Sequence, residues 1–289
     1  MHIFGINAIS FTNLFDLCYN VFIIALDYRT VHRKVIVIIL LLFAFGTNLA
    51  DADQIFVTLT SGADDIIFDG KWTFYTEWKE SSENMINFND GSRLSIKTAH
   101  DYENLYFLID FISDTSLQKF ADRGIVCIDS KLNRGDMPNE DDYCFSVVVG
   151  SQHPITLRGG NILAQTGFLE KINNHPQLIA AGGISDKNDR YTKNPHTSYE
   201  FKIPLETFGK SSIYGFYVVV YDANSGKAYS WPKDAAIETS PFIPEPKHWG
   251  ELVSPDKSIP EFDTPLFLLL SITVVVFLGR TRIIRQQHG

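Results

Sequence analysis

The stretch Asn104–Ile112, NLYFLIDFI, carries the clearest structural signal in the chain. Its apolar residues Leu105, Phe107, Ile109 and Phe111 occupy every second position. Successive side chains of a β-strand point to opposite faces, so this spacing places all four on one face. The stretch therefore predicts a strand that presents an apolar face to a core.

Other short apolar runs flank this strand, and no long segment between the two ends of the chain has the 3.6-residue period of a helix. They are RLSIKTA (93–99), IVCID (125–129), CFSVVV (144–149), NILAQT (161–166), QLIAAG (177–182), SYEFKI (198–203) and GFYVVVYD (215–222). Turn-forming clusters such as NDG, RGDMPNEDD and DANSG separate them. About eight short strands with such spacing predict an all-β fold, an antiparallel β-sandwich of jelly-roll-like type.

The middle of the chain is acidic. Residues 53–260 contain 19 Lys and Arg against 29 Asp and Glu, which gives a net charge of −10. A nucleic-acid partner requires a basic surface that displaces counterions from phosphates. The charge therefore argues against a nucleic-acid partner and favours neutral ligands or cations.

Residues 1–52 have the organisation of a leader. Basic residues at 29–34 precede the apolar run Val35–Phe45, and Ala50-Asp51-Ala52 follows. These are the three parts of a signal peptide, with cleavage expected after Ala52. Residues 1–30 are either a genuine extension or an over-long start assignment. An N-terminal membrane anchor of the same orientation is the alternative interpretation.

The C-terminal end predicts a membrane anchor. Residues 265–279 contain no charge and approach the length of a short transmembrane helix. The basic segment 280–289 should remain in the cytoplasm by the positive-inside rule. The domain at 53–253 is then expected outside the cell, joined to the helix by a stalk at 254–264.

The stalk also contains a short motif. Pro260-Glu261-Phe262, followed by the apolar segment and an arginine cluster, resembles the archaeal PEF-CTERM surface-sorting tails. The resemblance implies an archaeosortase-like processing enzyme that cuts near the motif and transfers the protein to a surface anchor. A plain membrane-spanning anchor is the alternative, and both interpretations place the protein at the cell surface.

Two of the three cysteines lie in the expected exported domain. Cys127 and Cys144 sit on segments that both have the pattern of strands, joined through residues 131–141. A hairpin would place the two side chains opposite each other, and an exported domain favours a disulfide. Two buried free thiols are the alternative.

Residues 64–253 resemble the family 9 carbohydrate-binding modules in the order of several segments. These are FDG and Trp72 near the start, HDYENLYF (100–107), Asp114, Cys127-Ile128-Asp129, YEFKIP (199–204), Phe216–Asp222, Trp231-Pro232 and HWGEL (248–252). The resemblance implies a β-sandwich that binds a glycan without hydrolysing it. It also implies structural calcium.

Sugar binding requires a flat apolar ring beside polar groups. The candidate ligand-binding residues are Trp231, Trp72, Trp249 and Tyr143. Trp231 is the preferred platform because Pro232 biases it toward an extended conformation after a loop. Packing in the core is the alternative for each ring. Family members can hold a sugar between two tryptophans, but this chain has no Trp between Trp78 and Trp231.

Acidic residues crowd the loop between the two cysteine strands. Asp129, Asp136, Asp141 and Asp142 supply the hard oxygen ligands that Ca²⁺ prefers, although no EF-hand spacing is present. Solvated carboxylates of a turn are the alternative.

The sequence lacks the common catalytic motifs, including G-x-S-x-G, H-E-x-x-H and the P-loop, so we expect no enzyme. The expected function is cell-surface glycan recognition. One alternative is a haem-binding electron-transfer sandwich of a related family, with Met85, Met137 and His153 as candidate ligands. Another is a structural envelope protein without a ligand.

Overall fold

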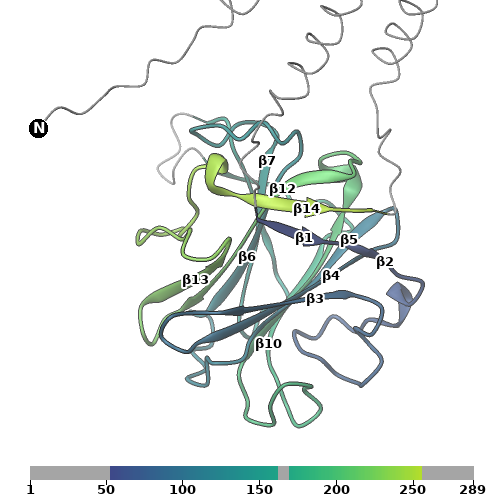
Figure 1. Ribbon diagram of the computed structural model, residues 1–289, viewed down its shortest axis with the longest axis vertical. Helices are drawn as coiled ribbons and strands as arrows, with labels where there is room; N and C mark the ends of the chain where they lie inside the picture. The colour runs from purple at the N-terminus through teal and green to yellow at the C-terminus, as the bar shows by residue number, and fades with distance from the viewer. Residues whose placement is uncertain (1–52, 162–168, 256–289) are drawn as a thin grey trace, which may run out of the picture. The chain divides into compact units, whose positions relative to one another are not determined.

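The computed structural model describes residues 53–161 and 169–255 (Figure 1). The expected leader, sorting motif, transmembrane helix and basic tail lie outside these residues, as does most of the predicted strand at 161–166. Within the described part of the chain, no helix is long and apolar enough to cross a membrane. Its helical segments are three 3₁₀ turns: η1 (Ala63–Asp65), η2 (Leu205–Thr207) and η3 (Pro246–His248).

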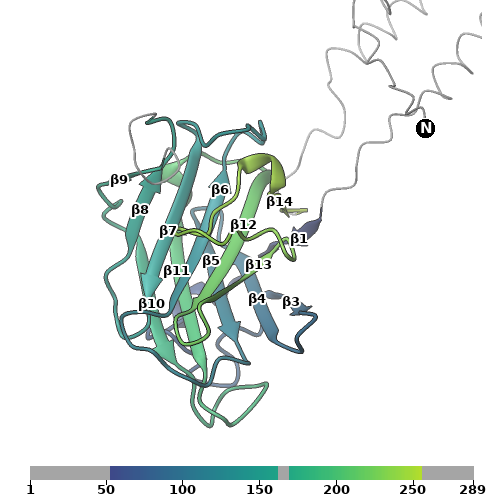
Figure 2. The same ribbon diagram turned by 90° about the vertical axis from the view of Figure 1, so that its left-hand side faces the viewer.

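The described strands form two sheets that pack face to face (Figure 2). In spatial order, the eight-stranded sheet contains β1 (Gln54–Phe56), β14 (Gly250–Val253), β12 (Ile213–Asp222), β6 (Arg123–Asp129), β7 (Asp142–Val148), β8 (Ile155–Arg158) and β9 (Glu170–Ile172), with β13 (Lys227–Trp231) also paired to β12. The six-stranded sheet contains β10 (Ile179–Ile184), β11 (Thr197–Pro204), β5 (Asn104–Phe111), β4 (Arg93–His100) and β2 (Thr58–Leu59), with β3 (Ser82–Asn87) paired to β4.

The core between the sheets follows the alternation of the central strands. Phe107 of β5 stacks on Phe216 of β12 with ring centroids 5.4 Å apart. Leu105, Ile109 and Phe111 join the same cluster, as the sequence pattern predicts. Burial of this apolar surface is the main source of stability for the sandwich.

The outer face of β5 is buried as well, which the alternation did not predict. Tyr106 and Leu108 belong to a second apolar cluster with Trp72 and Trp78. The segment between β2 and β3 covers this face of the six-stranded sheet, and Glu200 of β11 accepts hydrogen bonds from its residues. Every residue of β5 is therefore buried.

Both sheets are mixed, whereas the sequence predicted purely antiparallel pairing. The N-terminal strands β1 and β2 run parallel to β14 and β4. Val57 lies between β1 and β2, and its backbone N–H donates to the Val253 carbonyl at 2.9 Å. Residues 54–59 thus form one extended segment whose first half pairs in the eight-stranded sheet and whose second half pairs in the six-stranded sheet. Neither pairing is made through a hairpin turn, which joins neighbouring antiparallel strands.

The predicted cysteine hairpin is confirmed. β6 and β7 pair with Cys127 opposite Cys144, and the two sulfur atoms form a disulfide. Both side chains are fully buried beneath the segment that carries Phe242 and Trp249.

Candidate functional site

A groove of about 650 Å³ lies where β10, at one edge of the six-stranded sheet, meets the loop after β7. Four segments line it: the loop before β3 at Asp69, the β5–β6 loop at 119–120, the β7–β8 loop at 150–153, and residues 182–184 of β10. Main-chain hydrogen bonds join two of these segments, because Gly150 N donates to Gly182 O at 2.7 Å and Gly182 N donates to Ser151 O at 2.9 Å. Main-chain hydrogen bonds therefore hold the β7–β8 loop against β10 at the groove.

At the base of the groove, glycine residues allow neighbouring backbone segments to lie in close contact. A Cβ on Gly182 would lie 2.3 Å from the Val148 carbonyl oxygen. A Cβ on Gly70 would lie 2.3 Å from the nitrogen of Gly183, and Gly70 also has a φ of +87°. Side chains at these positions would push the segments apart.

Phe120 forms one wall of the groove, and the residue is 69% exposed. Its backbone has a φ of +63°, which is uncommon for a bulky residue, and its N–H donates to Val149 O at 2.9 Å. The ring lies beside Gly150, where an added Cβ would meet the rings and stems of Phe120 and Lys119 at 3.8 Å. The fold thus holds an aromatic ring in solvent beside the groove, a position that packing in the core does not explain.

Polar groups surround this ring. Lys119, Gln152 and His153 are exposed, and Ser151 is half-buried. The Ser151 hydroxyl accepts a hydrogen bond from His153 N at 3.0 Å, which orders the loop. An ammonium, an amide, an imidazole and a hydroxyl therefore belong to residues that line the same groove as this ring.

This combination suits a neutral polyhydroxylated ligand, because the C–H face of a sugar packs on an aromatic ring while its hydroxyls bind polar groups. Asp69 is the carboxylate among the residues that line the groove. Both of its carboxylate oxygens already have partners within the protein, since they accept hydrogen bonds from Lys71 N and Thr73 Oγ1. Glycoside hydrolysis generally requires a pair of carboxyl groups, and the lining of this groove does not provide one.

The tryptophans predicted as ligand platforms are buried. Trp231, Trp72 and Trp249 are 7%, 2% and 2% exposed. Trp231 packs on Phe216 at 5.5 Å and closes over Gly250, where a Cβ would meet its ring at 2.4 Å. None of these three rings offers a face to solvent. Trp231 packs in the core between the sheets, whereas Trp72 and Trp249 belong to the apolar clusters on the outer faces of the sandwich.

The remaining predicted ring, Tyr143, is half-buried on β7. It packs against the core, with Arg158 over its ring at 5.4 Å. Neither Tyr143 nor the tryptophans line the groove.

Three of the four predicted calcium ligands come together. Asp129, Asp141 and Asp142 each place one carboxylate oxygen within 4.8 Å of the others. Asp136 does not join them, since its side chain is 83% exposed and pairs with Lys247 at 2.9 Å.

The electrostatics of this cluster favour a cation. Burial, together with the charges of Asp129 and Asp141, raises the pKa of Asp142 to about 7. Asp142 Oδ1 is buried and has no hydrogen-bond partner. Oxygen ligands of this kind fit Ca²⁺.

The candidate haem ligands lie on three separate elements. Met85 is on β3, Met137 is in the β6–β7 loop, and His153 is in the β7–β8 loop. All three side chains are exposed.

The groove itself was not predicted. Phe120 lies in LQKFADRG, which has no feature of a binding motif. The available signal was the pair Gly182-Gly183 inside an apolar strand, because glycine in a strand marks a close backbone approach. The pairing of this strand with the loop after β7 depends on the tertiary structure.

No family model matches the chain, and a search of curated proteins finds no match. Similar solved structures include a family 9 carbohydrate-binding module from Caldicellulosiruptor kristjanssonii in complex with cellotriose, at 15% identity and a TM-score of 0.43 over 73% of this chain and 100% of that chain. The same module in complex with glucose is 15% identical to this chain, with a TM-score of 0.44. The similarity covers 71% of this chain and 97% of the module. A candidate carbohydrate-binding protein from Bacteroides uniformis is 9% identical to this chain, with a TM-score of 0.42. The similarity covers 71% of this chain and 100% of that protein.

Proposed function

We propose that residues 53–255 form a non-catalytic carbohydrate-binding domain whose ligand site is the groove beside β10. The observation that supports this proposal is the exposed ring of Phe120 among Lys119, Ser151, Gln152 and His153. The ring packs on one face of a sugar unit, and the polar side chains bind its hydroxyls. One such contact offsets little more than the free energy lost on association, so we expect weak affinity for a single sugar unit.

A glycan array followed by calorimetric titration tests the proposal. Phe120→Ala should weaken binding of the selected glycan on the order of tenfold, which corresponds to the loss of one stacking contact. Tyr75→Ala is the matched control, because Tyr75 is 80% exposed and does not line the groove. Absence of any glycan ligand, or equal affinity of Phe120→Ala and the wild type, would refute the proposal.

We propose that this domain is displayed outside the cell, held by the C-terminal apolar segment with or without processing at Pro260-Glu261-Phe262. The buried Cys127–Cys144 disulfide supports an oxidising compartment. Labelling intact cells with a membrane-impermeant reagent should modify residues of the domain. The mass of the mature protein will distinguish a retained anchor from a processed one.

We further propose that Asp129, Asp141 and Asp142 bind a structural Ca²⁺ ion. The unpartnered oxygen of Asp142 supports this proposal. The ion would stabilise the loop between β6 and β7 by neutralising three neighbouring carboxylates.

A further inference from the structure

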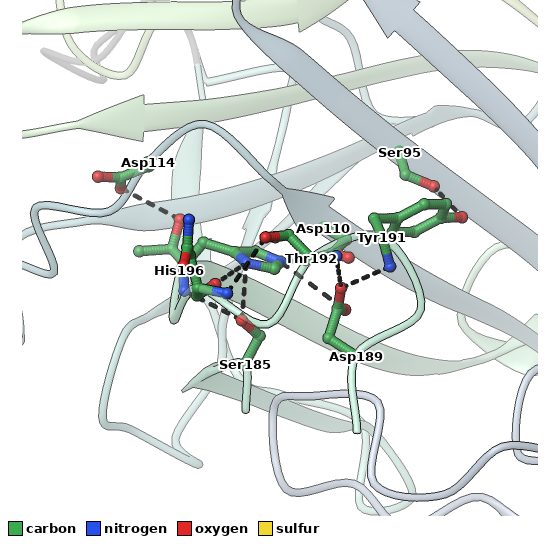
Figure 3. A network of polar contacts seen from close by, with 10 residues as sticks. Ser95, Asp110, Asp114, Ser185, Asp189, Tyr191, Thr192 and His196 are labelled. Carbon is green, nitrogen blue, oxygen red and sulfur yellow. Dashed lines mark hydrogen bonds and ion pairs between the residues drawn. The ribbon is translucent and has the colours of Figure 1, made fainter. Parts of the chain in front are cut away.

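A second group of ionisable side chains lies on the outer face of the six-stranded sheet, beneath the loop that joins β10 to β11. Asp110 projects from β5, Asp189 comes from the loop, and His196 immediately precedes β11 (Figure 3). One ligand atom of each lies within 4.8 Å of the other two. The three side chains are almost completely buried, at 2%, 1% and 0% exposure.

The imidazole of His196 is oriented by a backbone carbonyl. Nδ1 lies 2.8 Å from the Asn194 oxygen and 2.7 Å from Ser185 Oγ. A carbonyl oxygen only accepts hydrogen bonds, so Nδ1 carries a proton. Nε2 then faces the carboxylates, 2.6 Å from Asp110 Oδ1 and 3.8 Å from Asp189 Oδ2. Histidine ligands of metal ions commonly donate their other ring N–H in this way.

The loop carboxylate is also oriented. Asp189 Oδ1 accepts hydrogen bonds from the backbone N–H groups of Tyr191 and Thr192 at 2.8 and 2.9 Å. Its second oxygen, Oδ2, is left facing His196 and has no hydrogen-bond partner. Asp110 Oδ2 is likewise buried without a hydrogen-bond partner. Two carboxylate oxygens and one imidazole nitrogen therefore meet in a space closed to water.

The neighbouring cations do not satisfy these oxygens. Lys97 is buried on β4 but pairs with Glu83 at 3.1 Å. Arg190 also pairs with Glu83, at 3.7 Å. Buried carboxylate oxygens without a hydrogen-bond partner are energetically unfavourable. A bound cation would remove this unfavourable energy.

We propose that Asp110, Asp189 and His196 bind a divalent transition-metal ion, for which Zn²⁺ is the appropriate probe. An imidazole nitrogen with carboxylate oxygens is a ligand set that Zn²⁺ accepts, whereas Ca²⁺ and Mg²⁺ prefer oxygen ligands alone. The ion takes the place of the proton on His196 Nε2, and its two charges balance the two carboxylates. Binding therefore releases a proton when the imidazole is charged.

The ion would join the loop to the sheet. Ser185 directly follows Ile184, which lines the groove, and its hydroxyl contacts His196. A metal ion held between β5 and this loop thus stabilises one wall of the groove. The inference does not depend on the ligand of the groove, because the metal site and its test involve no sugar.

The test uses full-length protein that has been purified in mild detergent and stripped of metal. Calorimetric titration with ZnCl₂ should show one site, and Zn²⁺ should raise the melting temperature. Asp189→Asn should bind Zn²⁺ at least tenfold more weakly while preserving the side-chain shape, and His196→Gln should do the same. Asp186→Asn is the matched control, because Asp186 is on the same loop but pairs with Lys71.

Titration with Co²⁺ provides an independent readout, since a bound imidazole and carboxylates give visible absorption that Asp189→Asn should lose. Comparison of the far-ultraviolet circular dichroism of each metal-free variant with the wild type shows whether it is folded. Failure of the folded wild type to bind Zn²⁺ would overturn the proposal, as would unchanged affinity in Asp189→Asn. Zn²⁺ binding that is lost in Asp142→Asn but retained in Asp189→Asn would place the ion in the β6–β7 loop and also overturn it.

Discussion

The carboxylate of Asp101 accepts a hydrogen bond from the hydroxyl of Tyr106 at 2.6 Å. The same carboxylate accepts the backbone N–H groups of Glu103 and Asn104, at 2.9 and 2.6 Å. The turn before β5 is thus tied to the strand that follows it. These contacts give a physical reason for the spacing of Asp101, Asn104 and Tyr106 in the motif at 100–107.

The interaction between Asp101 and Tyr106 should make stability sensitive to acid. Burial by itself would raise the pKa of Asp101, but hydrogen bonds from Tyr106 and Asn104 outweigh this effect and hold the pKa below its ordinary value. A carboxyl group whose pKa is lower in the folded protein stabilises the fold at pH values above its pKa in the unfolded chain, which is about 3.9. This stabilisation is lost as the pH falls through the pKa that the group has in the folded protein. Tyr106→Phe should therefore lower the free energy of unfolding by about 1 kcal/mol at neutral pH.

Urea unfolding at several pH values measures this effect. The difference between wild type and Tyr106→Phe should be constant between about pH 5 and 8 and should shrink below about pH 4. Tyr75→Phe, at an exposed position, should show no difference at any pH. A Tyr106→Phe difference that persists unchanged in acid would show that the hydrogen bond does not act through the ionised carboxylate.

Gly70 and Gly91 provide a matched pair for the close approach at the groove floor. Their φ angles are +87° and +86°, so an alanine at either position would adopt a positive φ that L-residues rarely have. An added Cβ meets the Gly183 nitrogen at Gly70 but no atom within 4 Å at Gly91. Gly70→Ala should destabilise the protein by about 2 kcal/mol more than Gly91→Ala, in the range of overpacked sites. Equal midpoints in urea would contradict the close packing of these segments.

The disulfide should stabilise the domain mainly by restricting the unfolded chain. Cys127 and Cys144 are 17 residues apart, and the chain-entropy model gives about 3 kcal/mol for such a loop. The double variant Cys127→Ala, Cys144→Ala should lower the free energy of unfolding by about this amount. Two alkylatable thiols in unreduced, unfolded protein would contradict the bridge between Cys127 and Cys144.

The pattern of apolar residues along the sequence was sufficient to predict the central strands. It was insufficient to predict which aromatic side chains are exposed at the surface. The alternation in β5 predicted its core face, and the pairing of Cys127 with Cys144 followed from a local hairpin. The burial of Trp72 could not be predicted, because it depends on a segment that folds back over the six-stranded sheet. The burial of Trp231 depends on the pairing of β13 with β12, which turns its ring into the core between the sheets. Phe120 was missed for the converse reason, since only the folded chain shows that an apolar side chain has been left in solvent.

Calcium removal should affect the β6–β7 loop. Treatment with EGTA should lower the melting temperature by several degrees, because a ligand that binds only the folded state stabilises it. Asp142→Asn should abolish the calcium-dependent shift. Asp136→Asn should retain it, because the structure pairs Asp136 with Lys247, away from the other three carboxylates. The same melting temperature with and without EGTA would exclude a structural calcium ion.

Substitutions of Trp231 and Phe120 should affect different properties, stability in the first case and glycan binding in the second. Trp231→Ala removes a buried ring that packs on Phe216, and we expect it to lower the free energy of unfolding by about 3 to 5 kcal/mol. Phe120→Ala removes an exposed ring and should change stability by at most about 0.5 kcal/mol.

Glycan affinity should show the opposite pattern. Wherever Trp231→Ala remains folded, at low temperature or with added osmolyte, it should bind the glycan as the wild type does, because Trp231 does not line the groove. Phe120→Ala should bind more weakly at the same temperature. Unfolding curves and titrations on both variants measure the two quantities independently. Loss of affinity in folded Trp231→Ala with retention in Phe120→Ala would return the ligand platform to Trp231, and would contradict the burial of its ring in the core.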